Sequence, residues 1–534
     1  MPARLHLVRP GHAPVRLLVA LASTLALGTV LAQDRQPEPG DSHGRMRADL
    51  EFLASPPVAG RASLTQGADA AAWFLATELR KAGLRPGNGD SFLQPFDVVP
   101  LRLDREQSSI AVRHAAREQR FTPVAVAFPD PTSAIESTLD VVFAGFGITA
   151  PEFGYDDYAG LDVRGKAVLV FDHEPQEDDP GSRFHGRGLT LHASTWTKTR
   201  TAQQHGAAAL LVVTEPVNAH RSTPRPPDRA NAPSQALAAG ELRIPRVTLP
   251  ASAAAALLQP TGRTPADLQR DIDRALQPAS RTLDGVSITL RAVNATPQPQ
   301  VSLNVVGLLP GSDPVLRDET ILVTSHYDHL GIHEGRLYPG ANDNGSGTVA
   351  MVEVARRLSR TPLARSVLFV SFGSEEQLML GSYHYVAHPL RPLATTRAVL
   401  NLDMIGRNEE HTPESLGAYE ITAGRSDRLN LVGAAYSPEL AALLDRASAP
   451  AGLALSDKFD HESSMRTLFR CDHLPFLQKG IPAVWLFGGF HPGYHEPVDT
   501  IDRLDFDKMD RVVRLTVEAV RALAAGPPPR FRYR

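Results

Sequence analysis

The stretch "SVLFVSFGSEEQ", residues 366–377, joins an almost continuous apolar run to two neighbouring acids, Glu375 and Glu376. A run of this kind is typical of a strand buried on both faces, as in parallel sheets that are covered by helices. Neighbouring side chains of a strand point to opposite faces, so both glutamates can reach one site only if the chain has left the strand. The stretch therefore predicts a buried strand that ends in an acidic loop.

Three further apolar runs resemble this one: "ILVTS" (321–325), "AVLNL" (398–402) and "PAVWLF" (482–487). A segment with helical periodicity, "TVAMVEVARRLSR" (348–360), lies between two of them. Buried strands that alternate with helices predict an α/β fold whose mostly parallel mixed sheet is sandwiched by helices. Because ligands of such sheets bind beyond the carboxyl ends of the strands, the functional residues are expected there.

Histidines and acids occur at or just after the ends of all four runs, or at the start of the helix between them. They are His326, Asp328, Asp343, Glu375, Glu376, Asp403 and His495, with Tyr494 beside the last. One such residue is more often a cap or a loop hydrogen bond, but its repetition at successive strands argues for a shared site. Two histidines with several carboxylates suit a two-metal centre. Three more histidines, His329, His473 and His491, lie close enough to these motifs to line the same cleft.

Composition and motifs exclude several other classes of protein. The 55 basic and 59 acidic residues leave no basic excess for nucleic-acid binding. No HExxH motif of the zincin type occurs. Gly345 and Gly347 are not followed by the Lys-Ser/Thr pair of a phosphate loop, so nucleotide binding is not expected.

The N-terminus has the pattern of a secretory signal peptide. Three arginines, the last at Arg16, precede a short apolar stretch that ends in small residues at Ala32. We expect residues 1–32 to be removed, 33–44 to form a linker, and the product to be periplasmic or secreted, without stable membrane insertion. The single cysteine, Cys471, rules out an intramolecular disulfide.

Five motifs carry a resemblance to a known family: "HYDHLG", "GANDNGSGT", "GSEEQLMLGS", "NLDMIGR" and "YHEPVDTID". In this order they resemble the motifs of the zinc aminopeptidases called peptidase family M28. The resemblance implies a catalytic domain formed by residues 45–105 and 291–525, followed by a tail at 526–534. Residues 106–290 look like the β-rich protease-associated (PA) domain that many members carry as an insertion, through "GKAVLV" and "AQQHGAAALLVV".

The resemblance also implies a site that holds two zinc ions per chain. It assigns one zinc to His326, Asp343 and Asp403, and the other to Asp343, Glu376 and His495, so that Asp343 bridges the ions. It implies a cis peptide bond between Asp343 and Asn344. One departure is Cys471, where relatives often have serine, and we interpret it as a packing residue.

The remaining site residues receive catalytic roles from the same resemblance. Glu375 would be the general base, Asp328 would orient His326, and Tyr494 would help to stabilise the oxyanion. The function implied is a di-zinc aminopeptidase that hydrolyses N-terminal residues from peptides. The alternatives are another zinc hydrolase or a glutaminyl cyclase on the same fold, and a non-catalytic binding module, against which the complete set of ligands argues. Neither the side-chain preference for substrates nor the oligomeric state can be read from the sequence.

Overall fold

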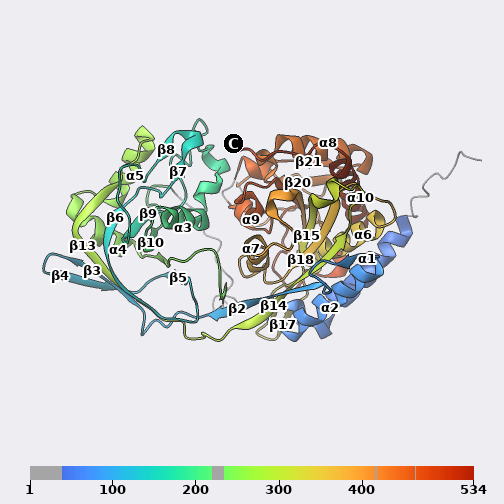
Figure 1. The fold of residues 1–534 in the computed structure, drawn as a ribbon, viewed down its shortest axis with the longest axis horizontal. Coiled ribbons are helices and arrows are strands. Elements are labelled where there is room, and N and C mark those ends of the chain that lie inside the picture. The colour runs from blue at the N-terminus through green and yellow to red at the C-terminus, as the bar shows by residue number, and fades with distance from the viewer. Residues whose placement is uncertain (1–38, 219–233, 414, 416–417, 463–464, 534) are drawn as a thin grey trace, which may run out of the picture.

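The computed structural model describes residues 39–218, 234–413, 415, 418–462 and 465–533. The predicted signal peptide and the start of the predicted linker lie outside these residues. Two sheets, one of ten strands and one of eight, organise two lobes that lie side by side (Figure 1). We call them the main lobe and the outer lobe. Within the described part of the chain, no helix combines the length and apolarity needed to cross a membrane.

Four parallel strands form the centre of the main sheet. Their order is β18 (Ser366–Phe372), β15 (Thr320–His326), β19 (Thr396–Asp403) and β22 (Ala483–Phe487). These are the four apolar runs of the sequence, and the prediction of parallel pairing is confirmed for all three neighbouring pairs. Their carboxyl ends therefore meet at one edge of the sheet.

The flanking strands make the sheet mixed. On one side β14 (Gln300–Leu309), β2 (Leu93–Leu101) and β11 (Ser234–Leu237) pair antiparallel in turn, and β1 (Arg85–Pro86) pairs with β14. On the other side β20 (Arg428–Val432) is antiparallel to β22 and parallel to β21 (Ala454–Ser456). The flanking strand β2 alternates buried and exposed positions in part, so it lacks the continuous apolar run that marks the centre.

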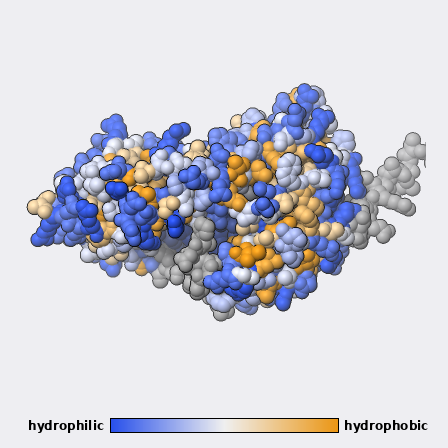
Figure 2. All heavy atoms as spheres, turned by 90° about the horizontal axis from the view of Figure 1, so that it is seen from below, coloured by the Kyte–Doolittle hydropathy of each residue, from blue (hydrophilic) through white to orange (hydrophobic). Residues whose placement is uncertain are grey.

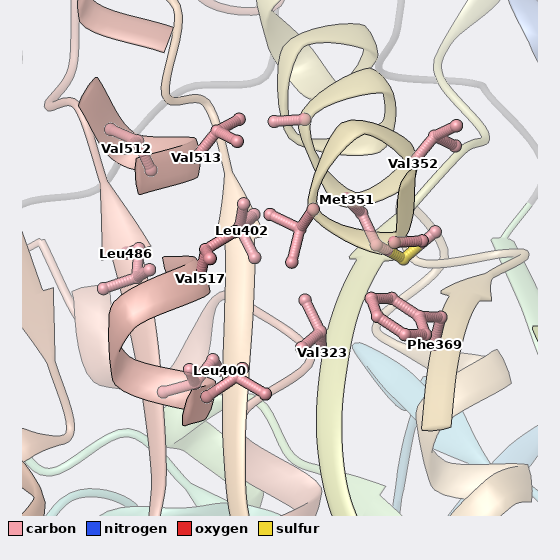
Figure 3. Close-up of a cluster of buried hydrophobic side chains, with 14 of the residues drawn as sticks. Val323, Met351, Val352, Phe369, Leu400, Leu402, Leu486, Val512, Val513 and Val517 are labelled. Carbon is pink, nitrogen blue, oxygen red and sulfur yellow. The ribbon is translucent and has the colours of Figure 1, made fainter. Parts of the chain in front are cut away.

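Helices cover both faces of this sheet. One face packs on α1 (Pro39–Leu53), α2 (Gln66–Lys81), α6 (Gly347–Leu358), α8 (Pro438–Ala451) and α10 (Phe506–Ala525). Figure 3 shows side chains of the central strands, among them Val323, Phe369 and Leu400, in one cluster with residues of α6 and α10. The other face packs on α7 (Leu380–Ala387) and α9 (Leu474–Leu477). Covering both faces explains why the central strands are apolar at successive positions.

The outer lobe is built around the eight-stranded sheet, in the order β4-β3-β13-β6-β9-β10-β12-β5. Its strands are β3 (Ser109–His114), β4 (Arg117–Phe121), β5 (Ala125–Ala127), β6 (Ile135–Phe143), β9 (Ala167–Phe171), β10 (Ala209–Val213), β12 (Arg246–Thr248) and β13 (Arg281–Ala292). Its helices are α3 (Thr195–Gln204), α4 (Ala251–Leu258) and α5 (Pro265–Ala275), and it has a hydrophobic core of its own. Although β11 comes from the same stretch of sequence, it belongs to the main sheet. The identification of this lobe as a PA domain stays a prediction.

The two lobes touch through α3. The Trp196 ring stacks on the Tyr383 ring of α7 at 5.5 Å between centroids, and Arg200 Nη1 donates to the Gln478 carbonyl at 3.1 Å. Seen from below, hydrophilic residues dominate the outer lobe, whereas apolar residues gather on the main lobe (Figure 2).

Candidate metal centre

The four parallel strands bring the predicted site residues to one edge of the main sheet. β15 ends at His326 and β19 ends at Asp403, while Glu375 follows the last residue of β18 by only a short turn. Ser374 has a φ of 58°, so the strand conformation is already broken before the glutamates. This break lets Glu375 and Glu376 serve one site despite being neighbours.

Asp343 lies between two imidazoles. It belongs to a short turn, Ala341–Ser346, that leads into α6. Its Oδ1 is 3.4 Å from His326 Nε2 and its Oδ2 is 3.0 Å from His495 Nε2. The peptide bond from Asp343 to Asn344 is cis, which confirms the prediction. Each oxygen of this carboxylate therefore faces a different nitrogen donor, as a bridging ligand requires.

The first group of possible ligands is His326, Asp343 and Asp403, whose ligand atoms lie within 4.8 Å of one another. Asp403 Oδ1 is 3.5 Å from His326 Nε2 and, although buried, has no hydrogen-bond partner. Asp403 Oδ2 accepts a hydrogen bond from Cys471 Sγ at 2.8 Å. A buried carboxylate oxygen without a donor is costly, so this group has the chemistry of a cation site.

The second group surrounds Glu376. Its Oε2 is 3.1 Å from His495 Nε2, and its Oε1 is 2.8 Å from His329 Nδ1. His329, Asp343 and Glu376 likewise have ligand atoms within 4.8 Å. Sequence reasoning placed His329 only among the residues that could line the cleft. Its spacing of three residues from His326, on the same loop, is the signal that could have found it.

Together the two groups offer only imidazole nitrogens and carboxylate oxygens. Zinc accepts this donor set, and such a set with a shared carboxylate suits a pair of ions. The residues present therefore fit the metal that the sequence predicted.

The two neighbouring glutamates differ in their electrostatics. Burial, reinforced by Asp472 and Glu376, raises the pKa of Glu375 well above its usual value, even though His326 opposes the shift. Burial acts on Glu376 in the same direction, but His495 and His329 together outweigh it and lower the pKa of Glu376 to about 2. Glu376 is therefore held as a charged carboxylate, whereas Glu375 is adapted to carry a proton.

Asp328 contacts the glutamates more closely than it contacts His326. Its carboxylate accepts the Glu375 N–H at 2.9 Å and the Glu376 N–H at 3.3 Å. Its Oδ1 is 3.8 Å from His326 Nδ1, and that nitrogen is nearer to the Asp328 carbonyl, at 3.2 Å. Asp328 thus anchors the backbone of the acidic loop.

Asp499 anchors the loop of Asp343, a role that sequence reasoning missed. Its carboxylate accepts the backbone N–H of Asn342 at 2.9 Å and that of Asp343 at 3.0 Å. Asp499 lies in the motif "YHEPVDTID", four residues after His495. Nothing in this motif indicates that its carboxylate bonds the backbone of Asp343. His491 Nε2 contacts Asn342 Nδ2 at 2.8 Å, so this histidine supports the same loop.

Two further residues named in the sequence analysis, Tyr494 and His473, lie in different surroundings. The Tyr494 ring stacks on the His495 ring, with 3.9 Å between centroids, at the edge of the site. His473 is fully buried and packs near Trp485, with 5.9 Å between ring centroids.

Comparisons with known proteins identify a family and several relatives. Residues 304–520 match the model of Peptidase family M28. The chain is 30% identical over 230 residues to Aminopeptidase YwaD of Bacillus subtilis (strain 168), which covers 41% of this chain and 44% of that protein. It is 27% identical over 241 residues to Leucine aminopeptidase 2 of Arthroderma otae, again covering 41% and 44%. The chain thus spans less than half the length of these relatives.

Among solved structures, one similar chain is an aminopeptidase from Aneurinibacillus sp. strain AM-1. It is 19% identical and matches with a TM-score of 0.46, over 92% of this chain and 96% of that one.

Proposed function

We propose, because residues 304–520 belong to peptidase family M28, that this chain is a zinc-dependent aminopeptidase that removes N-terminal residues from peptides. The observation that carries the proposal is the placement of Asp343 between His326 and His495, with Asp403 Oδ1, which lacks a hydrogen-bond partner, beside it. The aminopeptidase names of the relatives support the choice of reaction.

The proposed centre holds two zinc ions. His326, Asp343 and Asp403 would bind one, and Asp343, Glu376 and His495 would bind the other. His329 hydrogen-bonds Glu376 and would hold its carboxylate in place. When bound, zinc lowers the pKa of a coordinated water and polarises a carbonyl oxygen.

Glu375 is the proposed general base. Its Oε2 is 3.8 Å from His326 Nε2, so it borders the donor set without adding to either group of ligand atoms. Its raised pKa lets it accept a proton from the attacking water and donate it to the leaving amine. Asp328 holds its backbone, which keeps the carboxylate directed to the site.

Tyr494 is the proposed oxyanion stabiliser. Stacking on His495 fixes the plane of its ring beside the second group of ligands. Burial raises the pKa of Tyr494 well above its usual value, so its hydroxyl keeps the proton that a hydrogen bond to an oxyanion needs.

Activity assays with and without a chelator test this function. The purified protein is expected to release the chromophore from aminoacyl p-nitroanilides, and to lose this activity with chelator and regain it with zinc. The same panel contains an N-acetylated peptide and a peptide with N-terminal glutamine. Cleavage of the blocked peptide alone would identify another zinc hydrolase, cyclisation of the glutaminyl peptide would identify a cyclase, and zinc binding without any turnover would identify a binding module.

Export and the role of the outer lobe are part of the same proposal. The signal-like N-terminus supports a mature chain that begins near residue 33, and N-terminal sequencing of periplasmic or secreted protein tests it. The stretches "GKAVLV" and "AQQHGAAALLVV" support an outer lobe of the PA type. The contacts of α3 with α7 and Gln478 support a role for this lobe in limiting which peptides enter. The variant Trp196→Ala would then change the relative kcat/KM for long and short peptides, whereas an equal change for both would contradict a gating role.

A further inference from the structure

We propose that Arg61, a buried arginine outside the segment that matches the family model, is a positioning residue that holds together the two loops carrying the metal ligands. The inference rests on the proposed function, because it concerns the same metal centre. The N-terminal segment would thus contribute to metal binding although it lies far from the ligands in the sequence.

The side chain of Arg61 is fully buried and donates to carbonyl groups of both loops. Its Nε donates to the Tyr327 carbonyl at 2.7 Å, and Tyr327 lies between His326 and Asp328. Its Nη1 donates to Pro339 O at 2.8 Å and its Nη2 to Gly340 O at 2.9 Å, just before Asp343. One planar guanidinium therefore joins the loop of His326 to the loop of Asp343.

A further bond ties this connection to the first helix. Arg61 Nη1 also donates to the carbonyl of Leu53, the last residue of α1. Only a guanidinium has enough donors, in a fixed plane, for four carbonyls in different directions. The flexible single ammonium of lysine cannot reproduce this pattern.

The backbone around Arg61 is fitted to the same loops. The His329 N–H donates to the Arg61 carbonyl at 3.1 Å, and Ala62 forms a β-bridge with His329. Arg61 itself has a φ of 53°, a conformation that non-glycine residues seldom adopt without support. A Cβ at Gly60 would lie 2.4 Å from the Tyr338 carbonyl oxygen, so the backbone of this segment packs closely against that of Tyr338.

The charge of Arg61 suits its surroundings. Asp328, Asp499, Asp343 and Glu376 all stabilise the guanidinium electrostatically. Burial, the largest influence, lowers the pKa of Arg61 to about 10, which still leaves the group charged at neutral pH. A fixed cation near these carboxylates reduces their mutual repulsion before any metal is bound.

Arg365 provides a matched control at the opposite end of the sheet. It is 4% exposed, and its Nη1 donates to the carbonyls of Leu523 at 2.8 Å and Gly526 at 2.7 Å. Its Nε donates to Glu319 Oε2 at 2.6 Å. It is therefore also a buried arginine that binds several carbonyls, but it precedes β18 and lies away from the carboxyl ends of the strands.

The experiment compares Arg61→Lys with Arg365→Lys in the full chain. Zinc affinity is measured by competition with a chromogenic chelator, and Tm is measured for chelated and zinc-loaded protein. Arg61→Lys is expected to weaken zinc binding about 10–100-fold, as loss of groups that orient ligands does, and to shrink the Tm increment produced by zinc. Arg365→Lys is expected to lower both Tm values equally, with zinc affinity within about twofold of the unchanged protein.

A second measurement does not depend on the folding of any variant. Hydrogen exchange of the unchanged protein is followed with and without zinc. Because coupling between two sites is reciprocal, zinc is expected to increase the protection of residues 53–64 but not of 523–526. Equal zinc affinity in Arg61→Lys, or unchanged protection of 53–64, would overturn the inference. Failure of the unchanged protein to bind zinc at all would instead refute the proposed function.

Discussion

Each lobe contains a buried cluster of charged residues: Asp157, Glu174 and Lys198 form the outer cluster in the outer lobe, and the site residues form the cluster in the main lobe. The two clusters differ in what their carboxylate oxygens bond. In the outer lobe, Asp157 accepts the N–H groups of Phe146 and Ile148, both at 3.1 Å, and the Tyr155 hydroxyl at 2.9 Å. In the main lobe, Asp403 Oδ1 has no hydrogen-bond partner. A buried carboxylate that protein donors satisfy is a closed structural element, whereas one that lacks donors calls for a cation.

The two clusters also differ in the charge states that their surroundings favour. In the outer lobe, burial raises the pKa of Glu174 to about 8 and lowers that of Lys198 to about 8, so both groups tend toward neutrality. In the main lobe, the pKa of Glu376 falls to about 2 and that of His495 rises to about 9, since their attraction outweighs burial. The main-lobe cluster keeps separated charges, and a metal ion can take the place of the proton on His495.

The largest expected effect is on turnover. Glu375→Gln keeps the shape of the side chain but removes the base, so kcat is expected to fall about 10²–10⁴-fold. Zinc content, measured by elemental analysis, is expected to stay unchanged. The matched substitution in the outer lobe, Glu174→Gln, should leave kcat within about twofold. Near-normal turnover in Glu375→Gln would show that Glu375 is not the general base.

The next effect is on metal content. Glu376→Gln removes a charged oxygen from the second group of ligands, and the zinc content is expected to fall from about two ions per chain to about one. Dialysis against zinc-free buffer followed by elemental analysis measures this. If the variant keeps both ions, the ligand assignment of Glu376 is wrong.

A pH effect follows from His495. Its pKa of about 9 in the folded, metal-free protein lies above the usual value of 6.5, so it is protonated at pH 7. This raised pKa stabilises the metal-free fold fully below about pH 6.5, and the contribution is lost as pH rises through about 9. Zinc must displace the proton, so zinc binding at pH 7 is expected to release protons and to strengthen as pH rises toward 9.

Calorimetry in buffers of different ionisation enthalpy measures these protons. The same titration on His495→Gln is expected to release fewer of them. An equal number of released protons in both proteins would show that His495 is not the group displaced.

The outer cluster should show the opposite response to pH. Its Glu174 has a raised pKa, so the folded state binds the extra proton and loses stability as pH rises from about 4.5 to about 8. Glu174→Gln removes this dependence. Relative to the unchanged protein, the variant is expected to gain on the order of 3 kcal/mol in free energy of unfolding between pH 5 and pH 8. Urea denaturation at both pH values measures the gain, and parallel pH profiles for the two proteins would contradict it.

The smallest effect is expected at Cys471, which donates to Asp403 rather than serving only as a packing residue. Cys471→Ser keeps a donor at this position, so zinc affinity and kcat are expected to stay within about threefold. Cys471→Ala removes the donor and is expected to weaken zinc binding about tenfold. Chelator competition compares the two variants, and equal affinities would show that the hydrogen bond to Asp403 has no effect on zinc.

The central strands and the site residues at their ends were predictable because their signals are local. Burial on both faces forces a continuous apolar run, so β15, β18, β19 and β22 could each be recognised alone. The flanking strands β2 and β14 carry no such run over their whole length, and their antiparallel pairing was not foreseen. Local pattern also cannot show that β11 joins the main sheet while its sequence neighbours build the outer lobe.

The sequence by itself determined which residue types stand at the strand ends, and hence that the site is rich in nitrogen and oxygen donors. Only the tertiary structure decided which of them meet. Arg61 reaches Pro339 across 278 positions, and Asp499 reaches Asp343 across 156. Such contacts arise when packed elements bring distant backbone groups together, and no periodicity in the chain records them. The physical reason is that hydrophobic patterning depends on the burial of each residue, whereas a hydrogen bond depends on the position of its partner.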